Sequence, residues 1–398
     1  MGEYSARAVE RAMKIQEVIL RAISGQILWM QAAEIIGISD RSMRRWKQRY
    51  EEYGYDGLFD RRSKKPSPKR VPLVMVEKVL RLYRERYFDF NVRHFVEKLH
   101  AEHSVDLSYT WVKTALQMAG LVGKSRKRGK HRKKRPRRPL PGMMLHVDGS
   151  THAWLSGTAR QDLVAILDDA TSEVYYAQLV DQESTATVMA GLKEVVEQKG
   201  VFCSLYSDRG SHFFYTPMAG GPPDRNRKTQ IARALEELGI EPIPANSPQA
   251  RGRCERFFGT WQGRLPQELR LRHLTTMKEA NEFLRQEWIP LHNSNFAVAA
   301  QQPGTAFVPY AGSELNKVFS HQEQRTVGND NTVQFGKLSL QIEPQKFRFS
   351  MAKCRVLVCQ HLDETISVFY GPHLLGTYQA NGEAIKAPSV GRRRKIAA

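Results

Sequence analysis

The chain has 398 residues, enough for several domains, and its 61 Lys and Arg against 41 Asp and Glu give a formal net charge of +20. This excess favours a polyanionic partner, and nucleic acid is the natural candidate. No apolar run is long enough to cross a membrane, no secretory signal opens the chain and the four cysteines form no Cys-x-x-Cys pair, so we expect a cytoplasmic protein without a disulfide framework or zinc ribbon.

The first 60 residues predict a helix-turn-helix module, with helices over 8–24, 29–36 and 39–50. Ala33 suits the close crossing of two helices, Gly37 permits a left-handed turn, and Ser39 is the expected N-cap of the third helix. A merely solvated, charged helix is the alternative. We predict that the third helix contacts DNA through Arg41, Ser42, Arg44, Arg45 and Lys47.

A second helix-turn-helix module is predicted over residues 72–122, after a linker over 61–71; the stretch 54–70 is rich in Gly, Pro, Ser and basic residues. Its helices are expected over 73–86, over 92–99 and from an N-cap at Ser108. The start of the last helix supplies the candidate DNA contacts, which are Tyr109, Thr110 and Lys113.

Residues 124–138, called the basic segment below, hold 11 Lys or Arg and no acid, and without them the net charge falls to +9. Such a run favours a linker, within 123–140, that follows DNA phosphates, with a solvated linker as the alternative. The predicted contacts are Lys124, Arg126, Lys127, Arg128, Lys130, Arg132, Lys133, Lys134, Arg135, Arg137 and Arg138.

The middle of the chain predicts an α/β domain in which three strands lead into an alternation of helices and strands. Strands are expected over 163–167, 174–180 and 201–206, and a helix over 184–199 ends at Gly200. Asp168 and Asp169 are interpreted as turn residues of the hairpin between the first two of these strands. A mixed sheet of this order can bring carboxylates from strand ends and from a helix together.

Three acids in this domain stand in settings that suit metal-dependent phosphodiester chemistry. They are Asp148 in Leu-His-Val-Asp-Gly, Asp208 in Ser-Asp-Arg-Gly-Ser-His-Phe, and Glu255 in Ser-Pro-Gln-Ala-Arg-Gly-Arg-Cys-Glu-Arg-Phe. Carboxylate oxygens are the ligands that Mg²⁺ and Mn²⁺ prefer. His212 is close enough to Asp208 in sequence to approach a phosphate or a metal, but a packing or solvent role is favoured.

These three strings resemble the catalytic-core motifs of the retroviral-integrase superfamily, and bacterial insertion-sequence transposases are the closest match. The resemblance implies an RNase H-like core over 141–312, with Asp148, Asp208 and Glu255 as a catalytic triad that holds two Mg²⁺ or Mn²⁺ ions. The spacing of 47 residues between Asp208 and Glu255 is longer than the common pattern, and residues 216–229 are expected to be an inserted loop. The resemblance also implies a bacterial, nucleoid-associated protein.

Arginines surround the third acid of this triad. Our hypothesis is that some of Arg251, Arg253 and Arg256 hold phosphates beside the metals. A helix over 277–289 follows, and residues 332–380 then predict short strands, among them 332–335, 338–342 and 346–349. Their spacing suggests a small all-β barrel over 328–385, similar to the SH3-like domain of Mu transposase and retroviral integrases, with a basic tail over 386–398.

The function predicted from these features is a transposase that binds the ends of its element as double-stranded DNA, cuts there and joins the 3′-hydroxyl ends to target DNA. A homodimer or larger assembly on DNA is expected from the family. One alternative is a non-catalytic helix-turn-helix regulator derived from a transposase. Another is a ribonuclease H-like nuclease, which would share the metal chemistry but does not need two helix-turn-helix modules.

Overall fold

The structure is a computed structural model that describes residues 5–59, 70–124, 135–217, 224, 227–245, 252–312 and 314–385. It divides into two compact units, Met1–Val79 and Leu80–Ala398, and each is described by itself. None of the helices within these described ranges combines the length and apolar character that spanning a bilayer requires.

The first unit contains the three helices predicted there, α1 (Ala6–Ile23), α2 (Trp29–Ile36) and α3 (Asp40–Tyr53), followed by the short helix η1 (Gly54–Leu58). Gly37 ends α2 in the left-handed region at φ 74°, as the turn requires. Ser39 caps α3 by accepting a hydrogen bond from the Ser42 N–H at 3.3 Å. The predicted helix-turn-helix arrangement of these elements is therefore present.

The next three helices are α4 (Leu73–Glu85), which crosses the boundary between the units, α5 (Val92–His103) and α6 (Tyr109–Met118). Asn91 caps α5 and Ser108 caps α6, each accepting a hydrogen bond from the backbone N–H three residues on. In the second unit, Tyr83 and Tyr87 pack edge to face with Phe95 and Phe90, respectively, and form an aromatic core beside α5.

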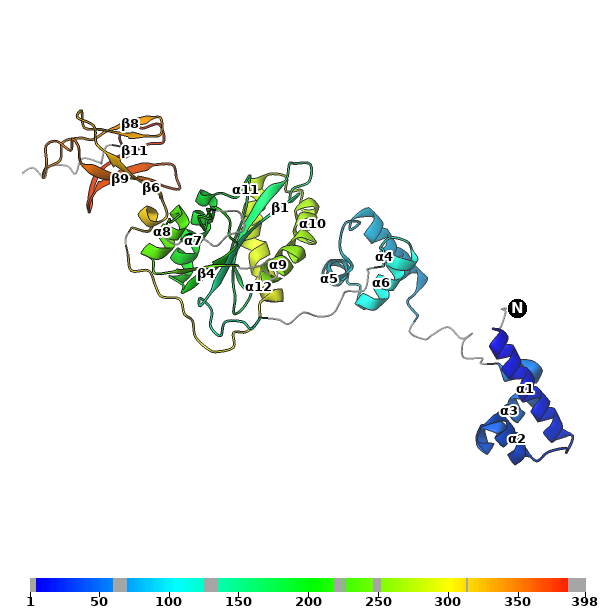
Figure 1. The fold of residues 1–398 in the computed structure, drawn as a ribbon. Helices are drawn as coiled ribbons and strands as arrows, with labels where there is room; N and C mark the ends of the chain where they lie inside the picture. Colours follow the sequence, from blue (N-terminus) through cyan, green and yellow to red (C-terminus); the bar gives the residue numbers. More distant parts are fainter. Residues whose placement is uncertain are drawn as a thin grey trace, which may run out of the picture. The chain divides into compact units, whose positions relative to one another are not determined.

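A five-stranded mixed sheet forms the centre of the second unit, in the order β3-β2-β1-β4-β5 (Figure 1). The strands are β1 (Leu145–His152), β2 (Gln161–Asp168), β3 (Val174–Val180), β4 (Ser204–Ser207) and β5 (Glu241–Pro244). The first three are antiparallel neighbours, whereas β4 is parallel to β1 and to β5. Strand and helix order follow the prediction, although β4 starts at Ser204 rather than at Val201.

Helices cover both faces of this sheet, and each face has its own apolar core (Figure 1). On one face, α7 (Thr185–Lys199) and α8 (Gln230–Glu237) pack against Leu145 and Val147 of β1. The other face carries α9 (Gly252–Gln262), α10 (Leu265–Leu271) and a continuous helical stretch made of α11 (Met277–Phe283), η4 (Leu284–Trp288) and α12 (Ile289–Phe296). This last stretch is longer than the predicted 277–289.

After the short helix α13 (Leu315–Val318), the chain forms a four-stranded sheet in the order β11-β10-β9-β6 and a separate β7-β8 hairpin. The strands are β6 (His321–Thr326), β7 (Thr332–Phe335), β8 (Leu338–Gln341), β9 (Arg355–Gln360), β10 (Ile366–Tyr370) and β11 (His373–Tyr378). Both sheets share one apolar core, which includes Val333, Val358 and Val368.

The prediction of a closed barrel is not confirmed, since the strands described between His321 and Tyr378 form these two separate sheets. The predicted strand over 346–349 forms only an isolated bridge between Gln345 and Arg348. Its apolar side chains, Phe347 and Phe349, are 50% and 83% exposed, so they contribute no barrel wall. The predicted basic tail over 386–398 lies outside the described residues.

Candidate active site

The register between β1 and β4 places two of the three predicted acids side by side. His146 of β1 is the parallel partner of Tyr206 of β4. Asp148 lies two residues after His146, and Asp208 lies two residues after Tyr206. Because side chains alternate along a strand, Asp148 leaves the sheet on the face of His146, whereas Asp208 directly follows Ser207, the last residue of β4. Neighbouring strands lie about 4.8 Å apart, so the backbone at Asp208 leaves β4 close to Asp148. Asp148 itself is buried, at 8% exposure.

The third acid, Glu255, approaches Asp148 from the first turn of α9. Asp148 and Glu255 line the same cavity of about 340 Å³, together with Gly149, Ser150, Phe258, Gly259 and Gln262. Two features hold α9 against β1: the buried Phe257 and Trp261, and a 2.9 Å hydrogen bond from Gln262 Nε2 to Ser150 Oγ. The motifs of Asp148 and Glu255 therefore meet at one cavity.

The donors around this cavity fit a divalent cation in chemistry, since all three acids offer only carboxylate oxygens. Among the residues described, however, no three His, Cys, Asp or Glu side chains gather at metal-binding spacing. Asp208 lies outside the residues that line the cavity.

A fourth carboxylate, Glu183, lies at this site and was not predicted. It directly precedes Ser184, the N-cap of α7, and a Cβ on Gly149 would collide with its Oε2. Burial, followed by repulsion from Asp208 and from Asp162, raises the pKa of Glu183 to about 7. Sequence inspection offered no signal for it, because a Glu before a helix cap is ordinary.

The raised pKa of Glu183 predicts a pH-dependent stability for the metal-free protein. Because the folded-state pKa of about 7 exceeds the ordinary 4.5, the stabilisation is complete below pH 4.5 and is lost as the pH rises through 7. The Glu183→Gln variant should lack this loss, which amounts to at most about 3 kcal/mol. Melting temperatures measured in EDTA between pH 5 and 8 would show this, and parallel curves for the two proteins would contradict it.

Asp168 ends β2 and Asp169 follows it, and both were predicted to lie in the hairpin turn. Asp168 has the expected turn role, because its Oδ1 accepts hydrogen bonds from the backbone N–H groups of Ala170 and Thr171 at 2.7 and 2.9 Å. Asp169 makes contacts beyond the turn role predicted for it. It is fully buried and forms ion pairs with Arg135 and Arg253 and a 2.7 Å hydrogen bond with His146 Nε2.

The arginines predicted to hold phosphates near Glu255 have different surroundings. Arg256 is exposed on α9, next to Glu255 in sequence. Arg253 is bound to Asp169 and donates to the Arg135 carbonyl oxygen at 3.0 Å, so its guanidinium is occupied by groups of the protein. Arg251 lies outside the described residues.

The basic segment is described only at its two ends. Lys124 is exposed. Arg135 and Arg137 contact the core, since Arg137 Nη1 donates to the carbonyl oxygens of Asp169 and Ala170 at 3.0 and 3.2 Å. The Arg138 backbone N–H donates to Asp169 Oδ2 at 2.8 Å. The predicted contacts that lie outside the described residues are Arg126, Lys127, Arg128, Lys130, Arg132, Lys133 and Lys134.

The predicted DNA contacts of the helix-turn-helix modules lie on helix surfaces. Arg41, Arg44 and Arg45 are exposed on α3, with Arg44 in a 2.8 Å ion pair to Asp40. The other two, Ser42 and Lys47, are half-buried, with Ser42 Oγ 2.9 Å from Ser39 Oγ and Lys47 over the Trp29 ring. On α6, Tyr109 and Thr110 are exposed and Lys113 is half-buried.

Charged side chains also join α5 to α10, which the sequence did not suggest. The Arg264 guanidinium pairs with Glu97 through two bonds of 2.5 and 3.0 Å, and Arg270 pairs in the same way with Asp89. The buried Glu268 binds His94 Nε2 at 2.7 Å and Lys98 Nζ at 2.9 Å. Burial opposes ionisation of Glu268, but the hydrogen bonds from His94 and Lys98 lower its pKa to about 2.

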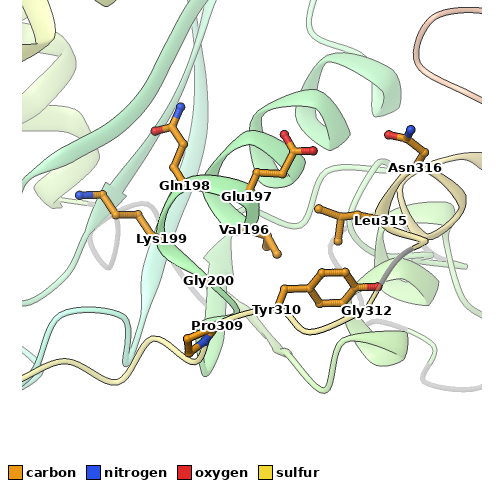
Figure 2. Close-up of a pocket in the computed structure, with 10 residues that line it drawn as sticks. All are labelled: Val196, Glu197, Gln198, Lys199, Gly200, Pro309, Tyr310, Gly312, Leu315 and Asn316. Atoms are coloured by element: carbon orange, nitrogen blue, oxygen red, sulfur yellow. The ribbon is translucent and has the colours of Figure 1, made fainter.

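A larger cavity of about 560 Å³ lies at the end of α7, between Glu197, Lys199 and Gly200 on one side and Tyr310, Leu315 and Asn316 on the other (Figure 2). None of the predicted catalytic or DNA-binding residues lines it. The smaller cavity beside Asp148 is therefore kept as the candidate active site.

Known protein families and individual proteins are similar to parts or to most of this chain. A family profile described as a helix-turn-helix domain matches residues 16–67, and one described as a homeodomain-like domain matches residues 42–116. One similar protein is from Sinorhizobium fredii and has the provisional name transposase y4bF. It is 29% identical over 92% of this chain and 80% of its own length. The transposase for insertion sequence IS1202 of Streptococcus pneumoniae is 25% identical over 88% of this chain and 82% of its own length.

The chain is a relative of bacterial insertion-sequence transposases. Solved structures similar to this transposase relative include the HTLV-2 integrase catalytic core domain in complex with magnesium, at 14% identity, a TM-score of 0.28, and coverage of 38% of this chain and 91% of the other. Another is a simian T-cell lymphotropic virus intasome with a PP2A regulatory subunit, at 12% identity, a TM-score of 0.33, and coverage of 78% and 99%. TM-scores this low support no argument about the fold. The fold is therefore described by the strand order of the chain itself.

Proposed function

We propose that this transposase relative is a DNA transposase that cleaves the ends of its own element and transfers the 3′-hydroxyl ends into target DNA. The observation that supports this most directly is the cavity shared by Asp148 and Glu255, beside which Asp208 directly follows β4, the parallel neighbour of β1. Such a group of oxygen donors suits phosphodiester chemistry assisted by divalent cations.

In this proposal, Asp148, Asp208 and Glu255 hold two Mg²⁺ or Mn²⁺ ions. When bound, the ions supply charge that activates the attacking oxygen and stabilises the leaving oxygen. The exposed Arg256 holds a DNA phosphate next to Glu255. His212 positions the loop after Asp208, because its Nδ1 lies 3.1 Å from Thr185 Oγ1 at the start of α7. No covalent intermediate with the protein is needed.

Recognition of the element end is assigned to the two helix-turn-helix modules. Exposed Arg41, Arg44 and Arg45 on α3 and exposed Tyr109 and Thr110 on α6 would contact double-stranded DNA. The basic segment would add affinity for phosphates that falls with salt concentration. Because two ends must be joined in one event, we propose a homodimer or larger assembly on DNA.

We propose the following division of the chain: a helix-turn-helix domain over 1–60, a linker over 61–71, a second helix-turn-helix domain over 72–122, a basic linker over 123–140, a catalytic core over 141–312, a small β domain over 328–385 and a basic tail over 386–398.

A strand-transfer assay with the full-length protein tests the proposal. The substrate is a labelled duplex of the element's terminal sequence with a supercoiled plasmid target, incubated with Mg²⁺, with Mn²⁺ or with EDTA. We expect joined product with either ion, none with EDTA, and none on a duplex of scrambled sequence.

The other outcomes separate the alternatives. Tight, sequence-specific binding without cleavage or joining under any metal condition would contradict the proposal and support a helix-turn-helix regulator. Cleavage of an RNA–DNA hybrid in preference to the terminal duplex would support a ribonuclease H-like nuclease instead.

A further inference from the structure

One buried carboxylate contacts three separate parts of the second unit. Asp169 is 0% exposed, yet its Oδ1 contacts His146 Nε2 at 2.7 Å, Arg135 Nη2 at 2.5 Å and Arg253 Nη1. Its Oδ2 accepts a hydrogen bond from the Arg138 backbone N–H at 2.8 Å. A buried charge is tolerated at such a place only when it is paired and hydrogen-bonded, and this one is saturated with donors.

The groups that Asp169 binds are neighbours of the proposed catalytic acids. His146 lies two residues before Asp148 on β1, and Arg253 lies two residues before Glu255 on α9. Residues two apart on a helix point about 200° away from each other, so Arg253 can be anchored while Glu255 faces the cavity. A single side chain thus spans the strand and the helix whose acids must cooperate.

The anchor acts where α9 is least secured by its own backbone. Helix α9 begins at Gly252, so Arg253 and Glu255 both belong to its first turn. The first turn of a helix lacks backbone partners for its N–H groups and frays readily. The Arg253 guanidinium also donates to the Arg135 carbonyl oxygen at 3.0 Å, which ties the same turn to the end of the basic segment.

We propose that Asp169 is a positioning residue of the active site: through Arg253 it fixes the rotation of the first turn of α9, and so sets Glu255 opposite Asp148. This inference rests on the proposed function. It goes beyond it by assigning a role to an acid outside the triad and by giving Arg253 an intramolecular task in place of phosphate contact.

Equilibrium binding of Mn²⁺, followed by the electron paramagnetic resonance signal of the free ion, tests this in the absence of DNA. The variants of the full-length protein are Arg253→Met, which leaves Asp169 paired with Arg135 and His146, and Arg253→Lys, which keeps a charge. Arg285→Met removes a side chain that is 65% exposed and serves as the matched control. Glu255→Gln shows whether the acids bind the ion at all.

We expect Arg253→Met to weaken Mn²⁺ binding 10- to 100-fold, the usual effect of losing a partner that orients a ligand. Arg253→Lys should recover most of that loss, and Arg285→Met should match wild type. Melting temperatures of all variants separate folding from positioning. If Arg253→Met does not fold, Arg253→Gln, which keeps an N–H donor for Asp169, takes its place under the same criteria.

Two results would overturn the inference, and only the second would also contradict the proposed function. Mn²⁺ binding that is weakened by Glu255→Gln but unchanged by Arg253→Met would leave the proposed function standing and reduce Asp169 to a structural role. Mn²⁺ binding equal in wild type and Glu255→Gln would remove the metal site, and with it both the proposed function and this inference.

Discussion

Replacing Asp208 by Asn is expected to lower the rate of strand transfer by at least about a thousandfold. A bound divalent ion contributes several kcal/mol to stabilising the charge that develops during the reaction, and each 1.4 kcal/mol corresponds to about tenfold in rate. Asn keeps the shape of the side chain and an oxygen that can accept the 2.8 Å hydrogen bond from the Gly210 N–H. The loop after β4 should therefore keep its conformation while the site loses a charged ligand.

The measurement is the initial rate of joined product, with DNA affinity and melting temperature determined on the same preparations. Asp148→Asn and Glu255→Gln should behave like Asp208→Asn, with terminal-duplex binding unchanged. Asp181→Asn, an exposed acid of the same domain, is the control and should retain full activity. Activity within tenfold of wild type in any of the three acid variants would remove that acid from the proposed triad.

Glu268→Gln is expected to destabilise the second unit by about 3 kcal/mol, because loss of one member of a buried ion pair leaves its partners without compensation. Glu268 is 2% exposed, and its carboxylate binds His94, Lys98 and Arg272. Lys98 keeps its 2.9 Å ion pair with Glu102, which limits the loss. A decrease of about 5 °C or more in the melting temperature of this unit should follow.

The lowered pKa of Glu268 also predicts how the destabilisation by Glu268→Gln varies with pH. Because the pKa of Glu268 is lowered to about 2 from 4.5, its stabilisation is present above pH 4.5 and is lost as the pH falls through 2. The difference between wild type and Glu268→Gln should therefore be largest near pH 7 and shrink in acid. Glu282→Gln, an exposed site on α11, is the control, and equal melting temperatures at pH 7 would rule out the effect.

Sequence patterns predicted those elements whose signals are local. The caps at Ser39 and Ser108, the αL glycine at position 37 and the alternation of strands and helices in the core all depend on near neighbours in sequence. Strand β6 was missed because its residues, His321–Thr326, are polar throughout and give no apolar alternation. Conversely, the apolar Phe347 and Phe349 suggested a strand where their side chains are exposed.

The candidate site shows the same division. The three candidate acids could be selected because each lies in a long string of recognisable residues. Glu183 and the role of Asp169 could not be predicted, because both depend on contacts across the fold: Glu183 meets Gly149 on β1, and Asp169 meets Arg253 in a helix 84 residues later. A buried carboxylate and a turn carboxylate look alike in sequence, and only their partners distinguish them.

The corner between α9 and α10 has a consequence for how much length variation the chain tolerates. Only Gly263 and Arg264 separate the two helices, and both are held by α5, through Asn91 Nδ2 to the Gly263 carbonyl oxygen and through Glu97 to Arg264. One inserted residue would turn α10 by about 100° relative to α9. Arg270 would then face away from Asp89, and Glu268 would face away from His94. The length of the connection between α9 and α10 therefore tolerates no insertion of even one residue without loss of both contacts.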